Sequence, residues 1–347
     1  MPNASRSVYI NTNPYPSEPA SSSPSSKKSH AIIAVFIVVL LFLGGIFFLN
    51  RTLITDYLKG SSYVPSSDME EIRDNLGLTA EGMRIFNATR PRLDSRDEFN
   101  FDCDSSDPEI AVYGCYHSDQ IYVYDIDNPE LAGFRESTTA HELLHAVWVR
   151  LSGIEKNRLV PFLESVYSSN QSLFDEALKT YPDSERLDEL YVRSATQVKT
   201  LPTELETHFS EIFTDQDKIV DYYDSYIAPF KELHEKIESL SKELESKKQI
   251  IDQKTEEYES KSNSFNKEVE EFNKCADTEG CFTSRTTFNS RRNELLDTAA
   301  TLDNLYSELG KLIDDYNVKI DEYNSNILHN NTLQNMINSN AKPGDIE

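Results

Sequence analysis

The chain has 347 residues, enough for one catalytic domain of ordinary size with accessory elements but not for several large domains. Its 34 basic and 59 acidic residues give a formal charge of −25 at pH 7, which repels nucleic acid and anionic lipid, so we expect no nucleic-acid partner. The acidic residues are spread through helix-like stretches. We therefore interpret them as a solvated helical surface rather than an acidic recognition tail.

Three segments precede the first predicted domain. Residues 1–29 are rich in Ser, Pro, Asn and Tyr without apolar periodicity, which predicts a disordered cytoplasmic tail. An uncharged apolar run from Ala31 to Leu49 then predicts a transmembrane helix over 30–50, followed by a linker over 51–64. A cleaved secretory signal is the alternative. We favour an uncleaved signal-anchor because the run is long and no small-x-small cleavage site follows it.

The basic residues that flank this run predict its orientation. Lys27 and Lys28 precede it, whereas Arg51 and Lys59 follow it, a bias that keeps the N-terminus in the cytoplasm. We therefore expect a single-pass protein of the cell membrane whose C-terminal domains are extracytoplasmic.

Cysteine spacing agrees with an oxidising compartment. The four cysteines form two close pairs, Cys103 with Cys115 and Cys275 with Cys281, which predict two local disulfides. A four-thiolate zinc site is the alternative, but neither pair has the short CxxC spacing of such sites.

A folded domain is predicted over 65–228, and it begins with two short helices, SSDMEEIRDNLG and LTAEGMRIFNATRP. Ser67 and Thr79 are the predicted N-caps, and Gly77 and Pro91 the predicted stops. Next, EIAVYGCY and QIYVYDI are rich in β-branched and aromatic residues and are separated by HSD, which predicts a β-hairpin.

The segment STTAHELLHAVWVRLSG predicts a buried helix with Ser137 or Thr138 at its start and Gly153 at its end. His141 and His145 are four residues apart and would project from one face, where two imidazoles can bind one Zn²⁺. An HExxH match by chance is expected in on the order of one such chain in a hundred, so two structural histidines in a buried helix are the alternative.

Glu142 lies between the two histidines and is the predicted catalytic residue. Its carboxylate can take a proton from a water that zinc has made acidic and pass it to a leaving amine. A purely structural zinc site would need the histidines but not this acid.

The residues HELLH, preceded by a strand, resemble the zincin metalloproteases, in which a strand beside the metal helix typically presents its edge to an extended substrate. The longer metzincin pattern is absent, because Trp148 and Leu151 stand at its Gly and third His. The gluzincin branch instead takes a Glu from a following helix. This resemblance implies that Glu189 in ELYVRSA completes the site. Tyr191 and His208 are separate candidates to stabilise an oxyanion, and a packing role is the alternative for the tyrosine.

The same stretch holds rival candidates for the third ligand: Gln197, Glu204, Glu206 and His208. The pattern HELLHAV, then ELY, then TQVKTLPTELETHF also resembles an uncharacterised family of membrane-anchored bacterial proteins over about residues 65–225. Members often have Glu where this chain has Gln197. Since an amide is a weaker zinc ligand than a carboxylate, this departure bears on catalytic competence.

A long coiled-coil hairpin is predicted over 229–335, followed by a disordered tail over 336–347. Apolar residues recur at alternating four and three spacing in two runs, from Leu233 to Phe272 and from Phe288 to Ile327, with lysines in the first seam. KCADTEGCFTS lies between them and suits a stapled turn, so we expect antiparallel arms of about 65 Å each. One long helix that dimerises in parallel is the alternative.

The predicted fold class is therefore α+β: a mainly helical zincin-like domain with a small β-hairpin or sheet, one preceding transmembrane helix and a following helical hairpin. The predicted function is that of a zinc metallopeptidase (HExxH) at the cell envelope, with Zn²⁺ as cofactor and a peptide or protein as substrate. The alternative is a catalytically inactive zincin module that carries a scaffold or adhesive arm, with a protein partner bound through the coiled coil. Gln197 favours the alternative, and the retained Glu142 favours the enzyme.

Overall fold

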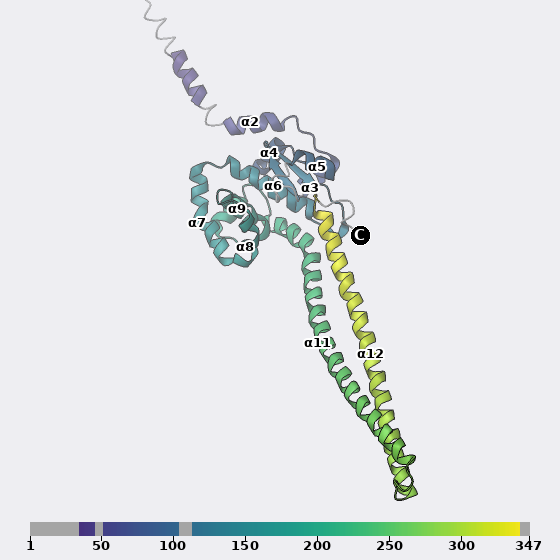
Figure 1. The fold of residues 1–347 in the computed structure, drawn as a ribbon. Helices are drawn as coiled ribbons and strands as arrows, with labels where there is room; N and C mark the ends of the chain where they lie inside the picture. Colours follow the sequence, from purple (N-terminus) through teal and green to yellow (C-terminus); the bar gives the residue numbers. More distant parts are fainter. Residues whose placement is uncertain (1–34, 46–50, 104–112, 341–347) are drawn as a thin grey trace, which may run out of the picture. The chain divides into compact units, whose positions relative to one another are not determined.

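The computed structural model describes residues 35–45, 51–103 and 113–340 (Figure 1). The chain divides into two compact units, Met1–Ile54 and Thr55–Glu347. In the first unit, residues 35–45 form a helix whose side chains are exposed. The rest of the predicted span over 30–50 and the predicted tail over 1–29 lie outside the described residues. Within the described ranges, no helix combines the length and the apolar character needed to cross a bilayer, so the membrane span stays a prediction.

The segment expected as a linker, 51–64, contains helix α2, Arg51–Gly60, in which Asp56 is buried. The two predicted helices follow as α3, Ser67–Asn75, and α4, Ala80–Thr89. The side chain of Ser66, rather than the predicted Ser67, caps α3. Gly77 lies just beyond the end of α3 with φ of +58°, the left-handed conformation that glycine adopts without steric cost.

A three-stranded sheet in the order β1-β3-β2 lies beside the helices. The predicted hairpin is present as β2, Gly114–His117, and β3, Gln120–Tyr124, which pair antiparallel. Two elements were not predicted: strand β1, Arg92–Asp94, which pairs parallel with β3, and helix α5, Arg96–Asp102. The predicted disulfide between Cys103 and Cys115 joins the end of α5 to β2.

Helix α6, Phe134–Arg150, carries the HELLH residues and follows the 3-10 turn η1, Pro129–Leu131. Both predicted ends of this helix are wrong. The helix begins after Gly133 (φ +88°), where an added Cβ would lie 2.6 Å from the Tyr222 carbonyl oxygen, so close packing sets the start. Gly153 does not end α6; it is the first residue of the next helix, because Ser152 caps that helix.

Four further helices complete the globular part: α7, Gly153–Ser169; α8, Gln171–Thr180; α9, Arg186–Gln197; and α10, Thr203–Phe209. The buried faces of α3, α4, α6, α7, α9 and α10 share one hydrophobic core with strand β3. Burial of this apolar surface is the main stabilising term for the domain. The protein is thus mainly helical with one small sheet, which confirms the α+β class.

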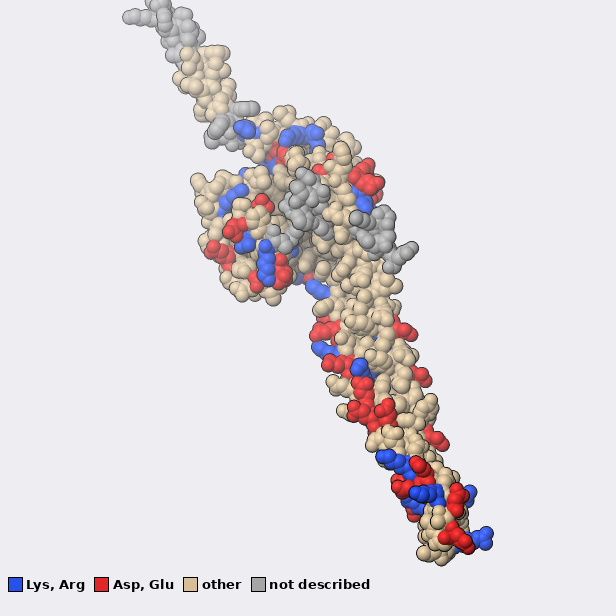
Figure 2. Space-filling model, viewed as in Figure 1, with Lys and Arg blue, Asp and Glu red and all other residues tan. Residues whose placement is uncertain are grey.

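Two long helices follow, α11, Gln216–Ala276, and α12, Arg285–Ile337. They lie side by side and antiparallel (Figure 1), and the predicted Cys275–Cys281 disulfide lies at their junction. The seam lysines Lys247 and Lys254 pair with Asp315 and Glu308 of the other arm, at 2.5 and 3.0 Å. Acidic and basic side chains intermingle along the arms on the face drawn in Figure 2. Helix α11 begins well before the predicted domain boundary at 228/229 and runs through it without a break.

Candidate metal centre

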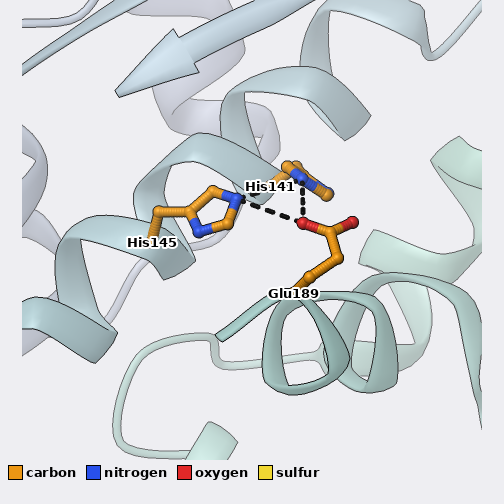
Figure 3. A group of neighbouring side chains, drawn as sticks. All are labelled: His141, His145 and Glu189. Atoms are coloured by element: carbon orange, nitrogen blue, oxygen red, sulfur yellow. Dashed lines mark hydrogen bonds and ion pairs between the residues drawn. The ribbon is translucent and has the colours of Figure 1, made fainter. Parts of the chain in front are cut away.

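Helices α6 and α9 bring three potential ligands together (Figure 3). His141 and His145 project from one face of α6, as their spacing predicts, and their Nε2 atoms lie 3.3 Å apart. Glu189 reaches them from α9, with Oε2 at 3.6 Å from His141 Nε2 and 3.5 Å from His145 Nε2. Among the described residues, these three are the group of His, Cys, Asp and Glu side chains whose donor atoms converge closely enough to hold a metal ion.

The spacing of these atoms fits a tetrahedral Zn²⁺. Bonds of about 2.0–2.1 Å in tetrahedral geometry place neighbouring ligand atoms about 3.3–3.4 Å apart, close to the three distances between His141, His145 and Glu189. Glu189 is fully buried, and its Oε2 has no hydrogen-bond partner within the described part of the chain. A buried carboxylate oxygen without a partner is costly, and a metal ion would satisfy it.

Two neighbouring charged residues orient these ligands. Asp188 Oδ1 lies 3.0 Å from His145 Nδ1, a contact that holds the imidazole proton on Nδ1 and leaves the Nε2 lone pair for a metal. Arg193, one helical turn after Glu189, donates a hydrogen bond from Nε to Glu189 Oε1. The carboxylate of Glu189 is thus fixed through one oxygen, and its other oxygen faces the histidines.

Neighbouring charges keep the carboxylate of Glu189 ionised, which is the form that binds a metal. Burial alone would raise the pKa of Glu189, but His141, Arg193 and His145 together hold it well below its usual value. For His145, burial lowers the pKa, but the hydrogen bond with Asp188 and the surrounding carboxylates outweigh burial and raise it to about 9. Without a metal, a protonated His145 therefore balances the neighbouring carboxylates, and a bound cation would have to displace that proton.

Glu142 lies beside the cluster on α6 and is 6 % exposed. Burial raises the pKa of its carboxyl. Strand β2 passes directly over it: a Cβ at Gly114 would lie 3.0 Å from Glu142 Oε1 and 2.7 Å from Thr138 Cγ2. Only glycine leaves room here for the Glu142 side chain, so strand and helix together define where this carboxylate lies.

A cavity of about 630 Å³ opens over the three ligands and Glu142. Its walls are rich in tyrosine, contributed by Tyr113, Tyr116, Tyr181, Tyr223 and Tyr226. The volume is in the range of ordinary ligand pockets, and its mixture of aromatic faces and a few charged groups is typical of them.

Strand β2 forms one border of this cavity and is an edge of the sheet as described. The Tyr124 N–H donates to the Tyr113 carbonyl, so the paired residues alternate along β2. The backbone N–H and C=O groups of Gly114 and Tyr116 therefore point away from β3, on the open side of the strand. Such an edge can pair with an extended chain.

The rival ligands lie in three different settings. Gln197 lines the same cavity as the three ligands, and its Oε1 has no hydrogen-bond partner among the described residues. Glu204 and Glu206 are exposed on α10. His208 is buried in the core, where its Nε2 lies 2.9 Å from the hydroxyl of the fully buried Tyr191. Neither His208 nor Tyr191 lines the cavity, a position that does not favour contact with an oxyanion.

Asp188, Arg193 and Gly114 were not singled out from the sequence. Arg193 follows Glu189 at the four-residue spacing of a helical ion pair, a signal that was available once Glu189 was chosen. Asp188 and Gly114 carry no such pattern, because their roles depend on contacts with α6 across the fold.

No protein-family model matches the chain, and no curated protein and no solved structure is detectably similar to it.

Proposed function

We propose that this protein is a zinc-dependent hydrolase that cleaves peptide bonds at the cell envelope, anchored in the membrane by the apolar run over 30–50. The observation that carries the proposal is the convergence of His141, His145 and Glu189 at mutual distances of 3.3–3.6 Å beside a buried Glu142. Chain topology follows from the flanking charges, which keep the N-terminus in the cytoplasm.

In this proposal each residue has a defined task. His141, His145 and Glu189 hold Zn²⁺, which when bound acidifies water and polarises a carbonyl group. Glu142 takes the proton from the attacking water and passes it to the nitrogen of the leaving amine. Burial raises the pKa of Glu142, which brings it closer to the value that suits a group that both accepts and returns a proton.

The substrate class follows from the cavity and its border. An extended peptide can add to the open edge of β2 through Gly114 and Tyr116, with its scissile carbonyl over the cluster and a side chain among the tyrosines. Aromatic walls favour apolar or aromatic side chains at that position. The proposal does not require a carboxylate at position 197, since the carboxylate of Glu189 takes the third ligand position.

Metal content tests the proposal first. We expect the full-length wild type, purified in detergent, to contain about one zinc per chain, and the His141→Ala and Glu189→Ala variants to lose it. Glu204→Ala is the matched control, because it removes an exposed glutamate from α10 and should leave the zinc content unchanged. A folded wild type without zinc would rule out the metal centre.

Activity is tested on the same material with a library of quenched fluorescent peptides. Glu142→Gln should keep its zinc but lose hydrolysis by at least about 100-fold, the scale of general acid–base catalysis. Zinc in both proteins with no cleavage by the wild type would favour the alternative, an inactive metal-binding module that carries the helical hairpin.

A further inference from the structure

Helix α2 attaches to the globular domain through its polar side. Asp56 is 2 % exposed and accepts two hydrogen bonds from Arg150 at the end of α6, both at 3.0 Å, as well as one from Arg84. Lys59 pairs with Asp119 at 2.5 Å, in the turn between β2 and β3. Charge-assisted and two-pronged contacts of this kind hold a helix in one orientation.

The opposite side of α2 is apolar and faces outward. Leu53, Tyr57 and Leu58 are 51 %, 71 % and 64 % exposed. At 100° per residue, these three lie within one half of the helix circumference, and Asp56 and Lys59 lie in the other half. A surface helix in water normally buries its apolar stripe and exposes its charges. Helix α2 instead buries Asp56 and leaves its apolar side exposed, although Lys59 is exposed as usual.

We propose that the apolar face of α2 lies in the interface of the lipid bilayer and seats the globular domain on the membrane surface. The uncharged run ends at Leu49, and α2 begins at Arg51, so a single residue separates the two. The helix is about 15 Å long, longer than the interfacial layer is thick, so its whole face stays in contact only if the helix lies along the membrane plane.

The composition of α2 suits this position. Leucine side chains enter the boundary between headgroups and acyl chains, and tyrosine is enriched at that depth. The long side chain of Arg51 can reach headgroup phosphates, whereas that of Lys59 reaches the carboxylate of Asp119 at the domain surface. Because Asp56 and Arg150 fix α2 to α6, this contact also fixes the orientation of the candidate metal centre relative to the bilayer.

This inference rests on the membrane anchor of the proposed function and is independent of the metal chemistry. The chain contains four cysteines, all in the two disulfides, so a single added cysteine can be labelled selectively. We would introduce Tyr57→Cys or Leu58→Cys into the full chain, with Glu71→Cys, an exposed position on α3, as the matched control.

Each variant would carry an environment-sensitive fluorophore and be reconstituted into phosphatidylcholine vesicles with or without a lipid that bears a nitroxide on its acyl chain. We expect the nitroxide lipid to quench the probes at positions 57 and 58 at least about threefold more than the probe at 71, because quenching requires close contact. Equal quenching at all three positions would overturn the proposal. Self-quenching that rises with protein concentration in detergent, without quenching by lipid, would assign the face to a second copy and also overturn it.

Failure of the anchor gives a different result. A full-length chain that does not remain with the vesicles overturns this proposal together with the membrane anchor, whereas its zinc content reports separately on the metal centre. Thermal unfolding of the labelled variants should match that of the wild type, since the substituted side chains are exposed.

Discussion

At the scale of single residues, the candidate metal centre depends on neighbours with different tasks. Glu189 provides the oxygen that faces the histidines, and the residue before it, Asp188, orients the imidazole of His145. Consecutive residues on a helix are 100° apart, so both reach α6 only because α9 packs against it at this point. Glu189 could be chosen from the sequence through a resemblance to the gluzincins. Asp188 could not, since no such pattern marks it and its partner His145 lies 43 positions away.

Replacement of Asp188 tests this orienting role. We expect Asp188→Asn to weaken zinc binding by about 10- to 100-fold without abolishing it, because an amide holds the His145 tautomer less firmly than a carboxylate. Competition with a fluorescent chelator measures the affinity. Asp183→Asn is the control, since Asp183 is an exposed partner of Arg186. Equal affinities of wild type and Asp188→Asn would contradict the role.

Gly114 provides a second test at this scale. Its replacement by Ala places a Cβ against Thr138 and Glu142, and we expect a loss of stability of about 1–3 kcal/mol from overpacking. Zinc content should be retained, because the ligands come from other residues, but peptide hydrolysis should fall as Glu142 is displaced. Gly310→Ala is the matched control. It has nothing within 4 Å and lies inside α12, where alanine should stabilise by about 0.5–1 kcal/mol. A Gly114→Ala protein with wild-type activity would mean that the strand does not constrain Glu142.

At the scale of elements, long periodic patterns were predictable and short contact-dependent elements were not. The hairpin arms and the helix around HELLH were recognised because apolar periodicity persists over several turns. Strand β1 has three residues, too few for alternation to register, and it forms because β3 offers its other edge. The start of α6 was misplaced for a related reason. The helix begins after Gly133 because the backbone there packs closely against Tyr222, a contact that no local pattern reveals.

The turn between α11 and α12 illustrates how a local disulfide acts. Cys275 and Cys281 close a short loop, and the rings of Phe272, Phe282 and Phe288 pack together beside it. Replacing both cysteines by Ser should cost about 2 kcal/mol of loop-closure entropy, so local amide exchange there should accelerate up to about 30-fold. Hydrogen exchange by mass spectrometry measures this. Amides near Leu240 and the zinc content should not change, and acceleration along the whole of α11 would show that the turn stabilises the entire hairpin.

At the scale of the whole molecule, residues 55–60 of α2 belong to the globular unit rather than to a passive linker. Its link runs from Asp56 through Arg150 to Tyr116, whose hydroxyl accepts a hydrogen bond from Arg150 Nη1 at 3.1 Å and whose ring lines the cavity. The sequence does not reveal this link, because Asp56 and Arg150 are 94 positions apart and each resembles an ordinary exposed charge. The segment that follows the predicted anchor is thus joined to a wall of the candidate site.

Removal of Asp56 tests that connection. The Asp56→Ala variant leaves Arg150, whose side chain is 9 % exposed, without this carboxylate, and Arg84 loses the same partner. Because Arg150 keeps Asp119 and Arg84 keeps Glu81, the free energy of unfolding should fall by about 1–3 kcal/mol. Asp74→Ala is the matched control, because it breaks an ion pair of the exposed Asp74 with Arg73 and should cost no more than about 1 kcal/mol. Chemical denaturation measures both.

A chain shortened to begin at Ser61 lacks Asp56 and Lys59 and should be destabilised like Asp56→Ala, whereas one that begins at Arg51 should keep wild-type stability. Equal stability of the two shortened chains would mean that α2 is a linker after all.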